Sequence, residues 1–176
     1  GDIRYELGYN LQTYGTSTTH RLKSALNRGG TVEYIYMTNV VADGVQNVLA
    51  ADLNWNPSYS YSELPAEYEG KEVPEHWNVM LQKVEPVEKG YPHFNHVYLA
   101  NVKATNAKQF ISASGWNDSL TLNDFTLYNL DVEAEKAGIV AHTKKFRLTD
   151  IKLKISDNSQ IEFNKNSQLK KNIRYE

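Results

Sequence analysis

Hydrophobic residues recur in the same short pattern at four places along the chain. Two apolar residues separated by one position are followed, two positions later, by Asn or Asp. The apolar pairs are Ile35/Met37, Val97/Leu99, Phe125/Leu127 and Phe146/Leu148, and the polar residues are Asn39, Asn101, Asn129 and Asp150. Because successive side chains on a strand point to opposite faces, each pair predicts a β-strand with one buried face.

The polar residue of each segment predicts a corner in the chain. The next apolar residue, such as Val40 after Asn39, is out of phase with the pair before it. On a straight strand that shift would turn the residue to the opposite face, so it stays buried only if the chain bends. A second apolar stretch follows each corner: Val48–Leu49, Phe110–Ile111, Ile139–Val140 and Ile161–Phe163.

The spacing of the corners predicts the fold class. The interval is 28 residues from Asn101 to Asn129 and 21 from Asn129 to Asp150. One turn of a parallel β-helix requires about that much chain, and Asn side chains can hydrogen-bond from one turn to the next. We therefore predict an all-β fold, a single-stranded solenoid of the parallel β-helix type, in which residues 1–176 form one domain.

Two segments depart from this repeat. The interval from Asn39 to Asn101 is 62 residues, and its excess lies at 52–92, which contains all five prolines. We predict a long inserted loop there, either functional or packed against the repeats, with a short helix after Pro74. The polar and basic segment 164–176 predicts a frayed or capping end.

Composition narrows the classes of function. The chain has 40% hydrophobic residues, 23% charged residues and a net charge of −2, which indicates a folded domain without a general attraction to nucleic acid. No apolar run is long enough to span a membrane. The absence of cysteine excludes disulfides, thiolate metal sites and a cysteine nucleophile. We predict no cofactor and no metal, because the pair His93/His96 lacks a third ligand nearby in sequence.

Arg21 and Lys23 are the first candidates for a binding site. Two residues apart on a strand, they share the face opposite Leu22, so both point to solvent if Leu22 is buried. Arg28 follows shortly after them. Such a cluster suits an anionic ligand, above all a carboxylate, which Arg can hold through two parallel hydrogen bonds.

Two tryptophans are further candidates. Trp55, at the start of the long loop, can offer a flat ring face to a sugar, or it can pack the base of the loop. Trp116 lies where a turn between repeats is expected, and we predict that it packs there.

The acidic residues do not predict a catalytic pair. Glycoside hydrolysis usually requires two carboxylates across the scissile bond. The glutamates of the long loop are spread along it, and Asp43, Asp118, Asp124 and Asp131 fall in or near turns. No catalytic residue is therefore predicted. A calcium-dependent pectate lyase is disfavoured for the same reason, since its ion requires clustered acids.

The segment "HRLKSALNRGGTVEYIYMTNV" at 20–40 resembles the region around the Arg-x-Lys motif of polygalacturonases, the pectin-cleaving enzymes of glycoside hydrolase family 28. Segments 75–81, 88–105 and 113–130 look like later turns of that family, especially of its Bacteroidetes members. The resemblance implies a right-handed parallel β-helix, a periplasmic or extracellular location, and hydrolysis of α-1,4-galacturonan. It implies that Arg21 and Lys23 bind the uronate carboxylate, and it places Trp55 near a substrate-contacting aromatic that is usually Tyr.

The family's catalytic motifs, Asn-Thr-Asp, Asp-Asp and Gly-His-Gly, precede Arg-x-Lys, and this chain contains none of them. The resemblance therefore implies the C-terminal part of such an enzyme, inactive alone, whose partner is an acidic polysaccharide. The alternative is a non-catalytic carbohydrate-binding or assembly module. In that case the exposed strand edge of the first turn pairs with another copy and forms a homodimer.

Overall fold

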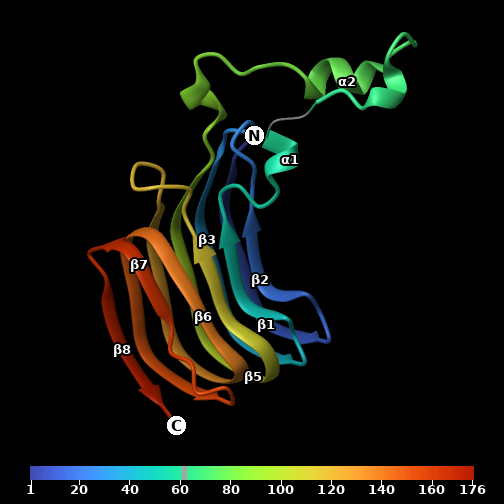
Figure 1. Cartoon of the computed structure of the whole chain (residues 1–176). Coiled ribbons are helices and arrows are strands. Elements are labelled where there is room, and N and C mark those ends of the chain that lie inside the picture. The colour runs from blue at the N-terminus through green and yellow to red at the C-terminus, as the bar shows by residue number, and fades with distance from the viewer. Residues whose placement is uncertain (61–62) are drawn as a thin grey trace.

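A computed structural model of the chain describes residues 1–60 and 63–176 (Figure 1). Residues 61 and 62, in the predicted loop at 52–92, lie outside the described residues. The strands are β1 (Ile3–Tyr14), β2 (Thr18–Lys23), β3 (Thr31–Asp43), β4 (Asn47–Asp52), β5 (His93–Ser114), β6 (Leu122–Ile155), β7 (Glu162–Ser167) and β8 (Lys170–Tyr175). The short helices α1 (Pro57–Ser60) and α2 (Glu75–Met80) lie between β4 and β5, with 3₁₀ turns at Ala66–Tyr68 and Val87–Gly90.

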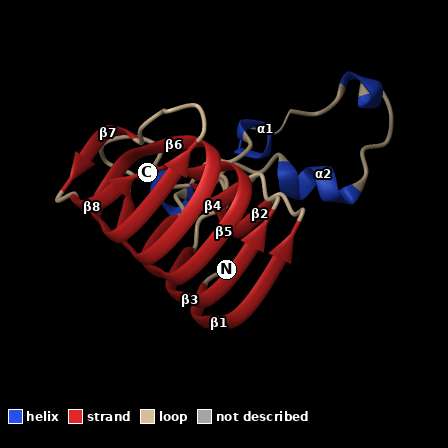
Figure 2. Ribbon diagram, turned by 90° about the horizontal axis from the view of Figure 1, so that it is seen from below, coloured by secondary structure: helices blue, strands red, loops and turns tan. Residues whose placement is uncertain are grey.

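The strands pair in two rows, and all pairs between these strands are parallel. Row A contains β1, β3, the beginning of β5 and the beginning of β6, and β8 pairs with a later part of β6. Row B contains β2, β4, the end of β5, the middle of β6 and β7. The strands β5 and β6 belong to both rows because they continue through the corner that separates β1 from β2. The predicted all-β class is confirmed, with parallel pairing of long strands (Figure 2).

The core lies on the inner side of both rows, where equivalent residues of successive strands stack. Ile35, Val97 and Phe125 are buried register partners in row A. Phe146 continues this column, with its ring 5.5 Å from the ring of Phe125. The alternation seen in the sequence therefore marks the buried face correctly, although Met37 is only partly buried.

The predicted corners coincide with left-handed backbone. Asn39, Asn101, Asn129 and Asp150 have φ between 52° and 56°. Asn and Asp adopt this conformation at lower cost than other residues that have a Cβ. A second bend, which the sequence did not suggest, lies five residues earlier in each segment. It is formed by Tyr34, His96, Asp124 and Lys145, and by Tyr5 in β1, all with positive φ.

The corner asparagines form a hydrogen-bonded ladder across the strands. Asn39 donates to Asn10 (3.3 Å), Asn101 to Asn39 (3.3 Å), and Asn129 to Asn101 (2.7 Å). The predicted stacking is confirmed for Asn39, Asn101 and Asn129, and Asn10 extends it into β1. Asp150 has the same backbone conformation, but no described residue connects its carboxylate to this ladder.

The second apolar stretches align only in part. Leu49 pairs with Ile111 as the spacing predicted, but the partner of Ile111 in β6 is Gly138 rather than Ile139. Gly138 has φ +100°, and a Cβ at this position would overlap the carbonyl oxygen of Ile111. Glycine is required here, so the apolar pair begins one residue later.

The long loop and the tail differ in how well they were predicted. The segment between β4 and β5 projects from the strands as an arm, and α2, which begins after Pro74 as predicted, buries no residue (Figures 1 and 2). For 164–176 the sequence allowed a frayed or a capping end, and the frayed alternative is wrong, because β7 and β8 both pair with β6. The outer side chains of these strands are polar. Lys170, Lys171 and Arg174 lie on β8, where their charge disfavours pairing of this edge strand with another chain.

Candidate functional site

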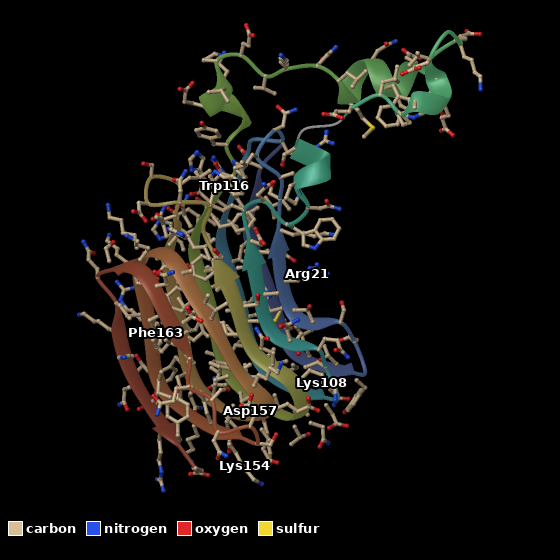
Figure 3. All side chains as sticks on the ribbon, viewed as in Figure 1. Arg21, Lys108, Trp116, Lys154, Asp157 and Phe163 are labelled. Carbon is tan, nitrogen blue, oxygen red and sulfur yellow. The ribbon has the colours of Figure 1, made fainter. Side chains whose placement is uncertain are left out.

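Arg21 and Lys23 project from the outer face of β2. Leu22 between them is buried with 6% of its surface exposed, whereas both cations are exposed. The predicted alternation is therefore confirmed. Neither cation forms an ion pair with a carboxylate of the described residues. Figure 3 shows Arg21 at the side of the molecule, below α1.

The indole of Trp55 lies against both cations. The Nζ atom of Lys23 lies 4.1 Å from the centroid of the ring, and the Cζ atom of Arg21 lies 5.2 Å from it. The backbone N–H of Trp55 donates to the carbonyl of Ser24 at 3.0 Å, which holds the indole beside the end of β2. With 40% of its surface exposed, Trp55 is accessible to a ligand. The structure thus brings together all three predicted site residues.

A groove of about 310 Å³ adjoins these residues. It is hollow because the residues beside Arg21 in the next two strands of row B are small, namely Ala50 and Ser112. The lining residues are Ser17, Thr18, Arg21, Leu22, Lys23, Gln46, Asn47, Ala50, Ala51, Asp52, Trp55 and Ser112. The groove therefore crosses β2 and β4 and reaches β5.

Asp52 is a groove residue that sequence reasoning missed. It is the register partner of Lys23, and Ser114 follows it in β5. Burial raises the pKa of its carboxyl, while a hydrogen bond from the backbone N–H of Asn54 (2.7 Å) acts in the opposite direction. Only the register between β2 and β4 shows that this acid lies beside Lys23.

Asn54 fixes the start of the arm. Its side-chain oxygen accepts hydrogen bonds from the backbone N–H of Leu26 (3.4 Å) and from the hydroxyl of Ser60. The hydroxyl of Ser60 also accepts from the N–H of Leu26 at 3.1 Å. These buried contacts connect α1 to the segment after β2, and thereby hold Trp55 in place next to the cations.

His20 precedes Arg21 but points to the interior. It is 6% exposed, and its Nε2 atom has no hydrogen-bond partner in the described part of the chain. Burial lowers the pKa of its imidazole to about 4, since the charged form would be desolvated. His20 is therefore a neutral core residue rather than part of the groove.

Other candidates lie elsewhere. Arg28 does not line the groove. Trp116 is 45% exposed, so its predicted packing is wrong, and Figure 3 shows it among the loops above the strands, apart from Arg21. His96 pairs with Asp124 (2.9 Å). Among the residues with described positions, no three His, Asp or Glu side chains cluster as metal ligands.

Asp124 is the centre of a small ionic cluster outside the groove. It accepts hydrogen bonds from Arg147 (2.5 Å) and His96, whose ring stacks on Tyr34 at 4.8 Å. Burial would raise the pKa of Asp124, but the hydrogen bonds from Arg147 and His96 outweigh burial and hold it below its usual value. Both carboxylate oxygens face protein donors, which is typical of a structural cluster.

No protein-family model matches the chain, and no curated protein matches it. Within the described residues, no helix is long and apolar enough to cross a membrane. We therefore infer the function of the groove from the chemistry of its side chains, above all Arg21, Lys23, Asp52 and Trp55.

Proposed function

We propose that this chain binds an acidic polysaccharide, galacturonan of pectin, in the groove beside Trp55, and that it is a polygalacturonase-like right-handed parallel β-helix located in the periplasm or outside the cell. The observation that carries the proposal is the convergence of Arg21 and Lys23 on the exposed indole ring of Trp55. Two cations and a flat aromatic ring are complementary to a uronate, which combines a carboxylate with a sugar ring.

The charges of the groove favour a carboxylate ligand. Arg21 and Lys23 have no ion-pair partner among the described carboxylates, so a ligand need not displace one. The guanidinium of Arg21 can donate two parallel hydrogen bonds to a carboxylate, and the ammonium of Lys23 adds a point charge. Hydrogen bonds between a charged donor and a carboxylate are stronger than those between neutral groups.

The strand register supports the β-helix reading. In row A, Tyr9, Thr38, Ala100 and Tyr128 are successive parallel partners, so each repeat returns to the same place after a connection through row B. The asparagine ladder has the same period, because its members occupy one position in each repeat. These features are typical of stacked turns along one axis.

We propose binding rather than hydrolysis by this chain. Asp52 is the one carboxylate that lines the groove in the described structure. Hydrolysis of a glycosidic bond usually uses a general acid and a second carboxylate on the opposite side of the bond. Without the second group, the chain lacks one of the two carboxylates on which this hydrolysis depends.

Calorimetric titration with trigalacturonate tests this proposal. Arg21→Ala and Lys23→Ala should each weaken binding by about tenfold, because each removes a charged donor to the ligand. The matched control is Lys103→Ala, which removes an exposed lysine from row A, on another face. Equal affinities of all four proteins, or no binding by the unsubstituted chain, would refute the proposal.

The edge of β1 favours a second candidate, an assembly module. β1 is an end strand of the sheet, and its Ile3, Leu7 and Tyr9 are each more than half exposed. An exposed strand edge with apolar side chains recruits other strands, and here it would pair with a second copy to form a homodimer. Light scattering should show a dimer that Leu7→Lys dissociates; a strictly monomeric protein at high concentration would exclude it.

A further inference from the structure

We infer that the groove selects acidic sugar chains in which the unit next to the bound uronate is uncharged, being either a neutral sugar or an esterified uronate. This inference rests on the proposed binding of a uronate by Arg21 and Lys23. It concerns the neighbouring position in the same groove, where Asp52 lies.

The groove defines the direction of an extended ligand. Its lining residues come from β2, β4 and β5, so a bound chain crosses the strands. Neighbouring strands lie about 4.8 Å apart, which is close to the length of one sugar unit. The outward side chains of these strands form two columns of register partners. One column runs from Arg21 on β2 to Ala50 on β4 and Ser112 on β5. The other column runs from Lys23 to Asp52 and Ser114.

The charge of the groove therefore reverses after one strand. Both cations are on β2, whereas β4 contributes the carboxylate of Asp52 and β5 contributes Ser112. A ligand carboxylate is attracted over β2 and repelled over β4. A chain with a carboxylate on every unit must place one of them near Asp52, unless only its last unit enters the groove.

Asp52 is not neutralised by a described cation. The ammonium of Lys23 lies over the ring of Trp55, and no ion pair connects it to Asp52. One carboxylate oxygen accepts the backbone N–H of Asn54, which is an uncharged donor. An ionised carboxylate in this position accepts hydrogen bonds, so it suits the hydroxyls of a neutral sugar and disfavours a second acid.

Affinities for two ligands test this selection. The first is trigalacturonate with three free acids, and the second is the same trisaccharide with one free acid and two methyl esters. The unsubstituted chain should bind the ester more tightly. Asp52→Asn should strengthen binding of the triacid by about fivefold, the effect of one unit charge at roughly 4 Å in water. The same substitution should change the affinity for the ester by less than about twofold.

Asp52→Asn keeps the oxygen that accepts from Asn54, so it is expected to fold. Asp131→Asn is the matched control, since it removes an exposed carboxylate from row A, on another face. Tighter binding of the triacid than of the ester by the unsubstituted chain would overturn the inference, and so would an unchanged triacid affinity in Asp52→Asn. Both results would leave the proposed uronate site intact, whereas failure of Arg21→Ala to weaken either ligand would refute that site itself.

Discussion

The ammonium of Lys23 lies 4.1 Å above the indole ring of Trp55, although 32 positions separate the two residues in the sequence. Lys23 ends β2, and Trp55 follows the end of β4, which is the neighbouring strand of row B. The parallel register between these strands therefore creates the contact. It presents a cation and an aromatic face together at the surface, and this combination is the basis of the binding proposal.

Trp55→Ala should weaken the binding of a uronate oligomer by about three- to tenfold. The substitution removes the ring face for the sugar and the cation–π contact that positions Lys23. Trp55→Phe should lose less, because it retains an aromatic face. Calorimetric titration measures both. Trp116→Ala removes another half-exposed indole outside the groove, and an equal loss of affinity in that variant would contradict the role of Trp55.

The pH dependence of stability should show a contribution from buried His20. Its pKa is about 4 in the folded chain and 6.5 when unfolded, so the unfolded state binds more protons between these values. The stability from neutral His20 is complete above about pH 6.5 and is lost as the pH falls toward 4. The difference amounts to about 3 kcal/mol.

Urea unfolding at several pH values measures this loss. His20→Leu should lack the slope between pH 6.5 and 4, since Leu49 and Ile111 occupy the same column and an apolar side chain fits there. Hydrogen bonds from Thr105 to Asp43 and from Ser159 to Asp157 lower the pKa of these carboxyls in both proteins, so they do not account for a difference between the two profiles. Parallel pH profiles of the two proteins would contradict the neutral, buried imidazole.

Gly138→Ala should destabilise the chain by at least about 3 kcal/mol, because the new Cβ overlaps the carbonyl oxygen of Ile111 and φ stays positive. Gly15→Ala is the matched control. Gly15 also has a positive φ, of +60°, but no described atom lies within 4 Å of the position that its new methyl group would take. This variant should lose only about 1 kcal/mol. Similar unfolding midpoints for both variants in urea would show that the close approach at Gly138 is unimportant.

Two substitutions of Asn101 distinguish the contribution of the hydrogen-bond ladder to stability from that of the bend. Its side chain donates to Thr38 (3.2 Å) and Asn39, and accepts from Asn129, while its φ is +52°. Asn101→Gly keeps the bend and should cost about 1 kcal/mol for the lost hydrogen bonds. Asn101→Ala adds the strain of a left-handed Cβ residue and should cost about 1 kcal/mol more. Equal stability of the two variants would show that the bend is unstrained.

The sequence predicted those parts of the fold that depend on local alternation. The apolar pairs around Phe125 and Phe146 mark buried strands, and asparagine marks the corners because it tolerates left-handed backbone. The bend at Tyr34 could not be predicted in this way, since tyrosine rarely adopts positive φ. Its ring stacks on that of His96 in the next strand, with the ring centres 4.8 Å apart.

Three residues of the candidate site, Arg21, Lys23 and Trp55, were predicted from the sequence. Arg21 and Lys23 were visible because two residues on a strand share a face. Asp52 was not, because its position beside Lys23 depends on the register between two strands 29 residues apart in the chain. The polar strand β8 and the part of β7 after Phe163 were missed for a similar reason: their backbone pairing with β6 does not require an apolar pattern.

The most direct test of the binding proposal is an NMR titration of the ¹⁵N-labelled chain with trigalacturonate. We predict that the largest shifts are those of the Arg21 side-chain Nε–H, the Trp55 indole N–H and the backbone amides of β2 and β4. The side chain of Trp116 and the amides of β8 should not change. Shifts confined to other surfaces, or no shifts at millimolar ligand, would contradict the claim that these two cations and this indole form a site for an acidic sugar.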